Sequence, residues 1–240
     1  MITLARFITI AILSLLITSC NFNFDSGITG NGNVVTEERD ADETFTEIRA
    51  SQGLDVYITQ SEIAAIEVEA DENIISLIST DIRNGVLSIH TEKNIGRCES
   101  KKIYVSLPIL EKVVASSGAD VYSTELFIVE NIEVKSSSGA DIRIEVEAVH
   151  VTCSASSGAG IKITGTADSL VADASSGSDI QARDLNAKDC NASASSGADV
   201  TVTVSEKLVA KGSSGGDVHY YGNPESVSKN KSVSGGVHKE

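Results

Sequence analysis

A six-residue phrase, Ser-Ser-Gly-Ala-Asp-Val, recurs along the chain and constrains its fold more than any other feature. Its glycines follow one another at steps of 18 to 21 residues, and the repeats are clearest from residue 115 to residue 237. The repeat glycines are Gly118, Gly139, Gly158, Gly177, Gly197 and Gly215. A unit of about 20 residues cannot bury an apolar face alone, so consecutive units are expected to stack. The sequence therefore predicts a repeat solenoid.

Apolar and polar residues alternate within each unit. In the second unit Ile132, Val134, Ile142 and Ile144 share one parity, and charged residues occupy the other. Successive side chains of a strand point to opposite faces of a sheet, so the apolar set is expected to face a core. After the N-terminal segment, no stretch shows the 3.6-residue apolar period of a helix. The chain is therefore predicted to be all-β.

Two features extend the predicted domain upstream of the regular repeats. Residues 51–56 are a diverged copy of the phrase, with Gly53 and Asp55 at its glycine and aspartate positions. Asn84-Gly85, between apolar residues, is a strong signal for a two-residue β-hairpin turn. We therefore expect a single β-helical head domain at residues 45–240.

Several solenoid classes share a short repeat, and the sequence separates them. The Leu-x-x-Leu-x-Leu pattern of leucine-rich repeats is missing, and a propeller blade is about twice as long. Hexapeptide β-helices need stricter multiples of six. A single-stranded β-helix of about 20-residue coils remains, and strand twist favours right-handed winding.

Two local details are expected of this coil. The repeat glycines should lie at bends where a side chain would be crowded. A ladder of inward-facing serine hydroxyls should run along the axis, because each hydroxyl can both donate and accept a hydrogen bond. These serines are Ser117, Ser138, Ser157, Ser176, Ser196 and Ser214.

The first segment has the features of an exported lipoprotein. Arg6 is its only charge, residues 7–17 are apolar, and Ile-Thr-Ser-Cys ends at Cys20. The apolar run is shorter than the ~20 residues of a transmembrane helix, which favours a removable signal over a retained anchor. The pattern resembles a lipobox, which implies a signal peptide at residues 1–19 and lipid such as palmitate on Cys20. A plain secretory signal is the alternative. Residues 20–44 are predicted to be the lipidated cysteine and a flexible tether.

The charge balance narrows the range of partners. The chain carries 19 basic and 34 acidic residues, a net charge of −15. Nucleic acid would be repelled, so it is not an expected partner. Anionic lipid headgroups would be repelled as well, so contact with a membrane is expected only through the N-terminal lipid. Cations and basic protein surfaces remain possible partners, because the negative charge attracts them.

The lipobox, the segment Gly-Leu-Asp-Val-Tyr-Ile-Thr-Gln at residues 53–60 and the Ser-Gly-Ala-Asp-Val array together resemble a known family. It is the putative auto-transporter adhesin head domain family, also called the GIN domain, of bacterial lipoproteins. The resemblance covers roughly residues 45–237. It implies a right-handed β-helix in an outer-membrane lipoprotein of the bacterial envelope, facing the periplasm or the cell surface. The family supplies no catalytic residue that could be carried over.

The most distinctive outward feature is a column of repeat aspartates. A hard cation such as Ca²⁺ is bound by carboxylate oxygens, so the column is a candidate cation site. The competing interpretation is that Asp beside Gly suits a turn and keeps the sheet soluble. The column consists of Asp120, Asp141, Asp179, Asp199 and Asp217, and Gly160 interrupts it.

Other candidate sites are weaker. Residues 212–216 match Gly-x-Ser-x-Gly, but that motif carries meaning only on a strand-to-helix elbow. His219, His238 and Asp217 could hold a metal, although capping of the solenoid end is the simpler interpretation. The remaining cysteines are expected to be buried small hydrophobic residues rather than metal ligands: Cys98, Cys153 and Cys190. No metal, cofactor or catalytic residue is predicted.

Three classes of function are compatible with this pattern. The first is an envelope-anchored adhesin that displays a binding surface for a glycan or protein ligand. The second is a structural or scaffolding lipoprotein that self-associates into a homo-oligomer. The third, supported by fold analogy alone, is a polysaccharide-processing enzyme. The absence of a clustered acid/base set favours a protein that is not an enzyme.

Overall fold

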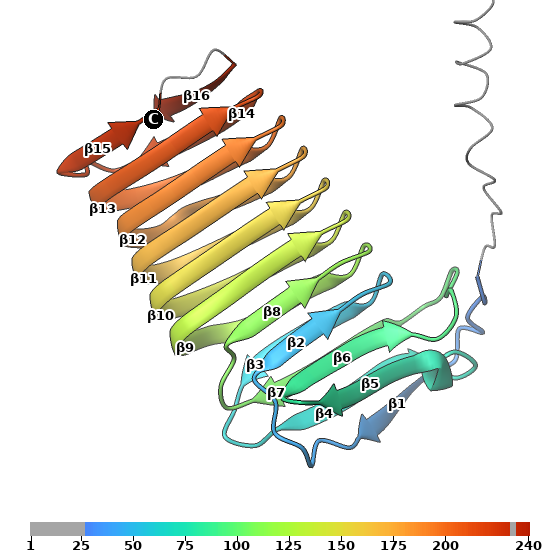
Figure 1. Ribbon diagram of the computed structural model, residues 1–240. Coiled ribbons are helices and arrows are strands. Elements are labelled where there is room, and N and C mark those ends of the chain that lie inside the picture. Colours follow the sequence, from blue (N-terminus) through green and yellow to red (C-terminus); the bar gives the residue numbers. More distant parts are fainter. Residues whose placement is uncertain (1–26, 231–233) are drawn as a thin grey trace, which may run out of the picture.

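The computed structural model describes residues 27–230 and 234–240, and these residues form a β-solenoid. The solenoid has about seven turns of roughly 19 residues, wound right-handed in Figure 1. Its regular coils are β9 (Asp120–Ser137), β10 (Asp141–Ser156), β11 (Gly160–Ser175), β12 (Asp179–Ser195) and β13 (Asp199–Ser213). Each pairs with the next in parallel and nearly in register. The predicted stacked coil is confirmed.

Each coil bends once, so the long strands contribute to two facing sheets. The first half of β9 pairs with β3 (Asp55–Gln60), and its second half pairs with β8 (Lys112–Ala115). At the far end, β14 (Gly216–Tyr221), β15 (Ser226–Lys229) and β16 (Gly235–Lys239) continue the two faces. Within the described ranges, no helical segment has the length and hydropathy of a membrane span.

An insertion after β3 closes the N-terminal end of the solenoid. It comprises β4 (Ala65–Asp71), the 3₁₀ turn η1 (Ile75–Leu77), β5 (Ile78–Arg83), β6 (Val86–Thr91) and β7 (Lys101–Leu107). β7 extends the sheet of β3, and β6 pairs with β2 (Glu47–Ala50). Asn84-Gly85 joins β5 to β6 as an antiparallel hairpin, as predicted.

The core lies between the two sheets and follows the predicted alternation. In β10, Ile142, Ile144 and Val146 are buried from one sheet, and Val151 and Cys153 are buried from the other. Next to each turn the inward residues are small, mostly alanine, because the two sheets approach one another there. The interior is therefore thin, which fits a chain with only 4% aromatic residues.

The repeat phrase forms a two-residue turn, and this corrects the predicted serine ladder. The six serines are exposed with φ between 51° and 57°, and the glycines that follow them have φ between 68° and 78°. Ala119 N–H donates to the Ser116 carbonyl across the turn at 3.2 Å. Positive φ at both central residues defines a type I′ turn. The ladder along the axis uses backbone groups instead, as in the 3.1 Å bond from Gly118 N–H to the Ser138 carbonyl.

The repeat glycines do not lie at crowded bends, contrary to the prediction. A Cβ at Gly118, Gly139, Gly158, Gly177 or Gly197 would meet no atom within 4 Å. Crowding therefore does not require glycine there. The positive φ does, because glycine reaches this region without a steric penalty.

The predicted flexible tether is wrong for the part of it that the structure describes. β1 (Val34–Arg39) pairs antiparallel with β4, and Ile28 forms a β-bridge with Ile95. The buried Asp71 carboxylate accepts hydrogen bonds from the backbone N–H groups of Gly32, Glu99 and Ser100 at 2.8 to 3.0 Å. These bonds lower the pKa of Asp71 and fix the segment against the domain. The signal peptide and Cys20 lie outside the described residues.

Candidate functional site

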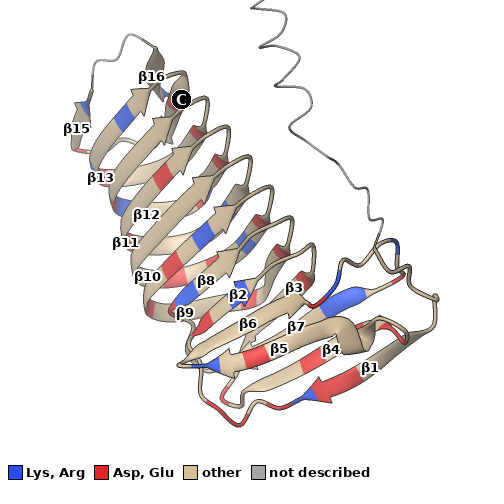
Figure 2. Cartoon of the chain, turned by 45° about the vertical axis from the view of Figure 1, so that its right-hand side comes forward, with Lys and Arg blue, Asp and Glu red and all other residues tan. Residues whose placement is uncertain are grey.

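The predicted aspartates form one column on the outward face of the solenoid. Parallel register places Asp120 beside Asp141, Asp179 beside Asp199, and Asp199 beside Asp217. Asp55 extends the column by one coil, and Gly160 stands between Asp141 and Asp179. Figure 2 shows acidic residues next to the turns of successive coils. We call the aspartates together with Gly160 the aspartate column.

The column is electrostatically unfavourable to the carboxylates within it. Partial burial raises the pKa of Asp120, and the charges of Asp141 and Asp55 raise it further. Partial burial also raises the pKa of Asp179, with Asp199 and Asp141 contributing. Among the described residues, no group of three or more His, Cys, Asp or Glu side chains is placed to hold a metal ion. Cation binding by the column stays a prediction.

Replacing Asp120 by Asn is expected to stabilise the domain at neutral pH. Each neighbouring carboxylate, ~4.8 Å away, repels it by ~1 kcal/mol in water before screening, so we expect a gain of about 0.5 kcal/mol. Because the folded-state pKa is raised, the gain is present above that pKa and disappears as pH falls below the unfolded value. Urea midpoints at several pH values measure it. Asp184→Asn, an exposed aspartate outside the column, serves as the control, and an equal gain there would contradict the argument.

A second column runs beside the first, two residues further along each strand. The three tyrosines at its N-terminal end stack: the rings of Tyr104 and Tyr57 lie 5.3 Å apart, and those of Tyr57 and Tyr122 lie 5.4 Å apart. The Arg143 guanidinium lies 5.4 Å from the centre of the Tyr122 ring. The aromatic–cationic column consists of Tyr104, Tyr57, Tyr122, Arg143, Lys162, Gln181, Thr201, His219 and His238.

The stacking decides what the tyrosines can offer a ligand. Ring faces cover one another along the axis, so the rings present mainly their edges and hydroxyls to solvent. Partial burial raises the pKa of Tyr104 and of Tyr122, and nearby carboxylates add to the effect. Both phenols therefore keep their protons at neutral pH and can donate hydrogen bonds. This column was not predicted from the sequence, although from Tyr57 to His219 each member follows a member of the aspartate column by two positions.

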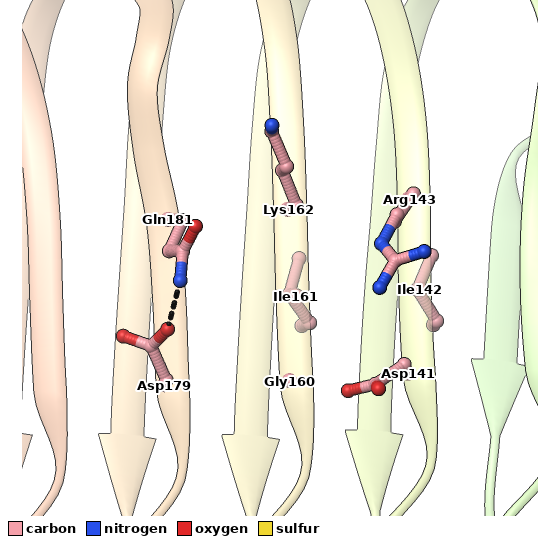
Figure 3. A pocket seen from close by; sticks show the side chains of 8 residues that line it. All are labelled: Asp141, Ile142, Arg143, Gly160, Ile161, Lys162, Asp179 and Gln181. Carbon is pink, nitrogen blue, oxygen red and sulfur yellow. Dashed lines mark hydrogen bonds between the residues drawn. The ribbon is translucent and has the colours of Figure 1, made fainter.

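The two columns enclose a groove at the interruption of the aspartate column. The groove has a volume of ≈590 Å³ and is centred on β11. Asp141 and Arg143 line one side, Asp179 and Gln181 line the other, and Lys162 stands above Gly160 (Figure 3). The Gln181 side-chain amide donates to the Asp179 carboxylate at 2.6 Å. We call this depression the Gly160 groove.

The remaining predicted candidates do not assemble into a second site. Residues 212–216 are one more copy of the turn, with Ser214 at φ 51°. Cys153 and Cys190 are buried, and burial raises the pKa of each thiol to about 12. Cys98 is a partly buried free cysteine with a raised thiol pKa, again chiefly through burial.

The two histidines lie at the C-terminal end of the aromatic–cationic column. Their rings stack at 5.1 Å. His219 Nδ1 lies 2.7 Å from a Glu240 carboxylate oxygen, and His238 Nε2 lies 3.5 Å from a carboxylate oxygen of Asp217. Each ring therefore has a carboxylate neighbour of its own. This placement on the last strands agrees with the capping interpretation.

Fold and site together define a β-solenoid protein whose outward face carries a column of aspartates beside a column of aromatic, cationic and polar side chains. The chain belongs to the family described as "Putative auto-transporter adhesin, head GIN domain", whose model matches residues 44–224. This membership supports an adhesin-like role at the envelope or cell surface.

Solved structures share the fold. A crystal structure of a "putative adhesin" from Bacteroides fragilis is 20% identical with a TM-score of 0.83, covering 89% of this chain and 100% of that one. A "putative lipid binding protein" from Parabacteroides distasonis is 22% identical with a TM-score of 0.68, covering 89% and 99%. A "putative adhesin" from Parabacteroides merdae is 20% identical with a TM-score of 0.68, covering 89% and 98%. These descriptions name adhesion and lipid binding rather than catalysis. No match was found among curated proteins.

Proposed function

We propose that this protein is an envelope lipoprotein that acts as an adhesin, and that its two outward columns bind an extended glycan. The observation that carries the proposal is the Gly160 groove, where carboxylate, guanidinium, ammonium and amide groups converge on one open surface. Sugars are recognised by such a mixture of donors and acceptors, because each hydroxyl both donates and accepts.

The regular spacing of the columns supports an extended ligand over a compact one. Outward side chains at equivalent positions follow one another from coil to coil, ~4.8 Å apart, which is similar to the length that one sugar unit adds to an extended chain. A linear polysaccharide lying along the solenoid axis would meet an aspartate at most coils, with an aromatic, cationic or polar side chain beside it. Weak contacts at several coils then add up to useful avidity.

The anchor belongs to the same proposal. Lipid on Cys20 would hold the acidic domain at a membrane that its charge does not favour. Incorporation of a labelled palmitate analogue in a bacterial host, abolished by Cys20→Ala, is the expected result. Equal labelling of that variant would contradict lipidation at this position.

Binding to a glycan array by the full-length chain, purified in detergent, tests the adhesin function. We expect binding to one or more linear glycans, and a loss of at least tenfold in affinity for Arg143→Ala. Lys188→Ala, an exposed lysine outside both columns, should bind normally. Capture of a protein ligand with no glycan bound would overturn the glycan assignment.

A further inference from the structure

The coil at the centre of the Gly160 groove differs from every other coil of the aspartate column. From β9 to β14 each coil places an aspartate at this position except β11, which has Gly160. The Asp141 carboxylate leans toward the space that a side chain at Gly160 would occupy. One carboxylate is therefore missing, and the surface is hollowed at that place.

The cations above this gap have no carboxylate oxygen within ion-pair distance among the described residues, although the charge of Arg143 partly offsets the rise in the pKa of Asp120 on the neighbouring coil. Arg143 and Lys162 lie on adjacent strands in register, and neither forms an ion pair among the described residues. In the repeated pattern, the missing carboxylate would lie two residues before Lys162. With Asp141 and Asp179, the groove is lined by two cations and two carboxylates, so its lining charges balance on a chain whose net charge is −15.

The groove is polar in a definite direction. Its lower edge, next to the turns, carries the acceptor carboxylates of Asp141 and Asp179. Its upper edge carries the donor groups of Arg143, Lys162 and Gln181. A ligand that matches both edges needs hydroxyl donors at one end and an anionic acceptor at the other.

We propose that the Gly160 groove binds a hexuronic acid unit of an acidic polysaccharide. In a pyranuronate ring the carboxylate lies across the ring from the vicinal hydroxyls at C2 and C3. With the diol on the two aspartates, the sugar carboxylate lies at Arg143 and Lys162, where charge-assisted hydrogen bonds are strongest. A neutral hexose has a hydroxymethyl group in place of the carboxylate, so it can accept hydrogen bonds from Arg143 and Lys162 but forms no ion pair with them. This inference rests on the proposed glycan-binding function and names the class of sugar.

Gly160→Asp is the sharpest test, because it restores the residue that the other coils carry. The new side chain would crowd the Asp141 carboxylate, which can rotate away, so the fold should persist. The added carboxylate would fill the groove and repel the anionic ligand. Lys162→Gln removes one charge from the groove and keeps a hydrogen-bond donor. Lys188→Gln makes the same change at an exposed lysine of β12 outside the groove and serves as the matched control.

The measurement is calorimetric titration of the full-length chain with short galacturonate, glucuronate-containing and mannuronate oligosaccharides, each compared with its neutral counterpart. At least one uronate should bind tenfold or more tightly than its counterpart. Gly160→Asp should abolish that binding with an unchanged circular dichroism spectrum, Lys162→Gln should weaken it about tenfold, and Lys188→Gln should leave it unchanged.

The outcomes separate this inference from the general function. Equal binding of acidic and neutral sugars, or uronate binding that survives Gly160→Asp, overturns the uronate assignment and leaves a glycan-binding protein. No binding of any glycan on the array overturns the proposed function itself.

Discussion

Gly165→Ala should destabilise the solenoid by more than about 3 kcal/mol. Gly165 lies in β11 with φ +114°, where residues with a Cβ are strained. A Cβ at this position would lie well under 3.0 Å from the carbonyl oxygen of Val146 in the preceding coil. The obstructing atom belongs to the backbone, so no rotamer change relieves the clash. Losses of this size arise only from a few mechanisms, and forced backbone strain is one of them.

Gly158→Ala provides the matched control. Gly158 has φ +71°, but a Cβ there would meet no atom within 4 Å. Its cost should be the conformational penalty alone, about 1–2 kcal/mol. Urea unfolding followed by far-UV circular dichroism gives both values, because the chain has no tryptophan to report by fluorescence. Similar losses for the two variants would show that contact with Val146 does not decide the requirement for glycine.

Period and parity were sufficient to predict the solenoid, because both are local properties of the chain. The spacing of the repeat glycines predicted one coil for each copy of the repeat. The alternation of apolar and polar residues predicted which side chains face the core, such as Ile142 and Val200, and both are buried. The serine ladder failed for a physical reason. A two-residue turn adds an even number of residues, so every second residue still falls on the inward set before and after the turn. Counting by twos therefore assigns Ser138 to the inward set, although it lies in the turn outside both strands. Asn84-Gly85 forms the same type of turn with a clearer signature.

The candidate site was predictable only in part. The aspartate column and its interruption at Gly160 could be read directly from the repeats. The stack of Tyr104 on Tyr57 could not, because these residues are far apart in the sequence and meet only through the inserted strands β4 to β7. The lean of Asp141 and the absence of an ion pair at Lys162 within the described residues depend on side-chain placement. The alternation of residues shows which face of the sheet a side chain lies on, but it does not show which side chains it contacts there.

Phe127→Ala should cost about 3–5 kcal/mol, the usual loss for truncation of a buried aromatic residue. Phe127 has no exposed surface and is among the largest fully buried side chains of the chain. It lies at the bend of β9, where the register with β10 shifts between Arg143 and Glu145. β9 is longer than the coils that follow it, and Phe127 stands in register with the smaller Val146. Truncation would leave a cavity that a thin two-sheet core cannot fill by relaxation.

Two further variants test whether the loss comes from the buried volume of the Phe127 side chain. Phe127→Leu retains most of the apolar surface and should cost less than about 1.5 kcal/mol. Ile128→Ala, at a side chain that is 61% exposed, should change the free energy of unfolding by less than about 0.5 kcal/mol. Urea midpoints and slopes for the three variants measure the series, and a constant slope licenses comparison of the free energies. If Ile128→Ala were as damaging as Phe127→Ala, the bend rather than its buried ring would set the stability of this coil.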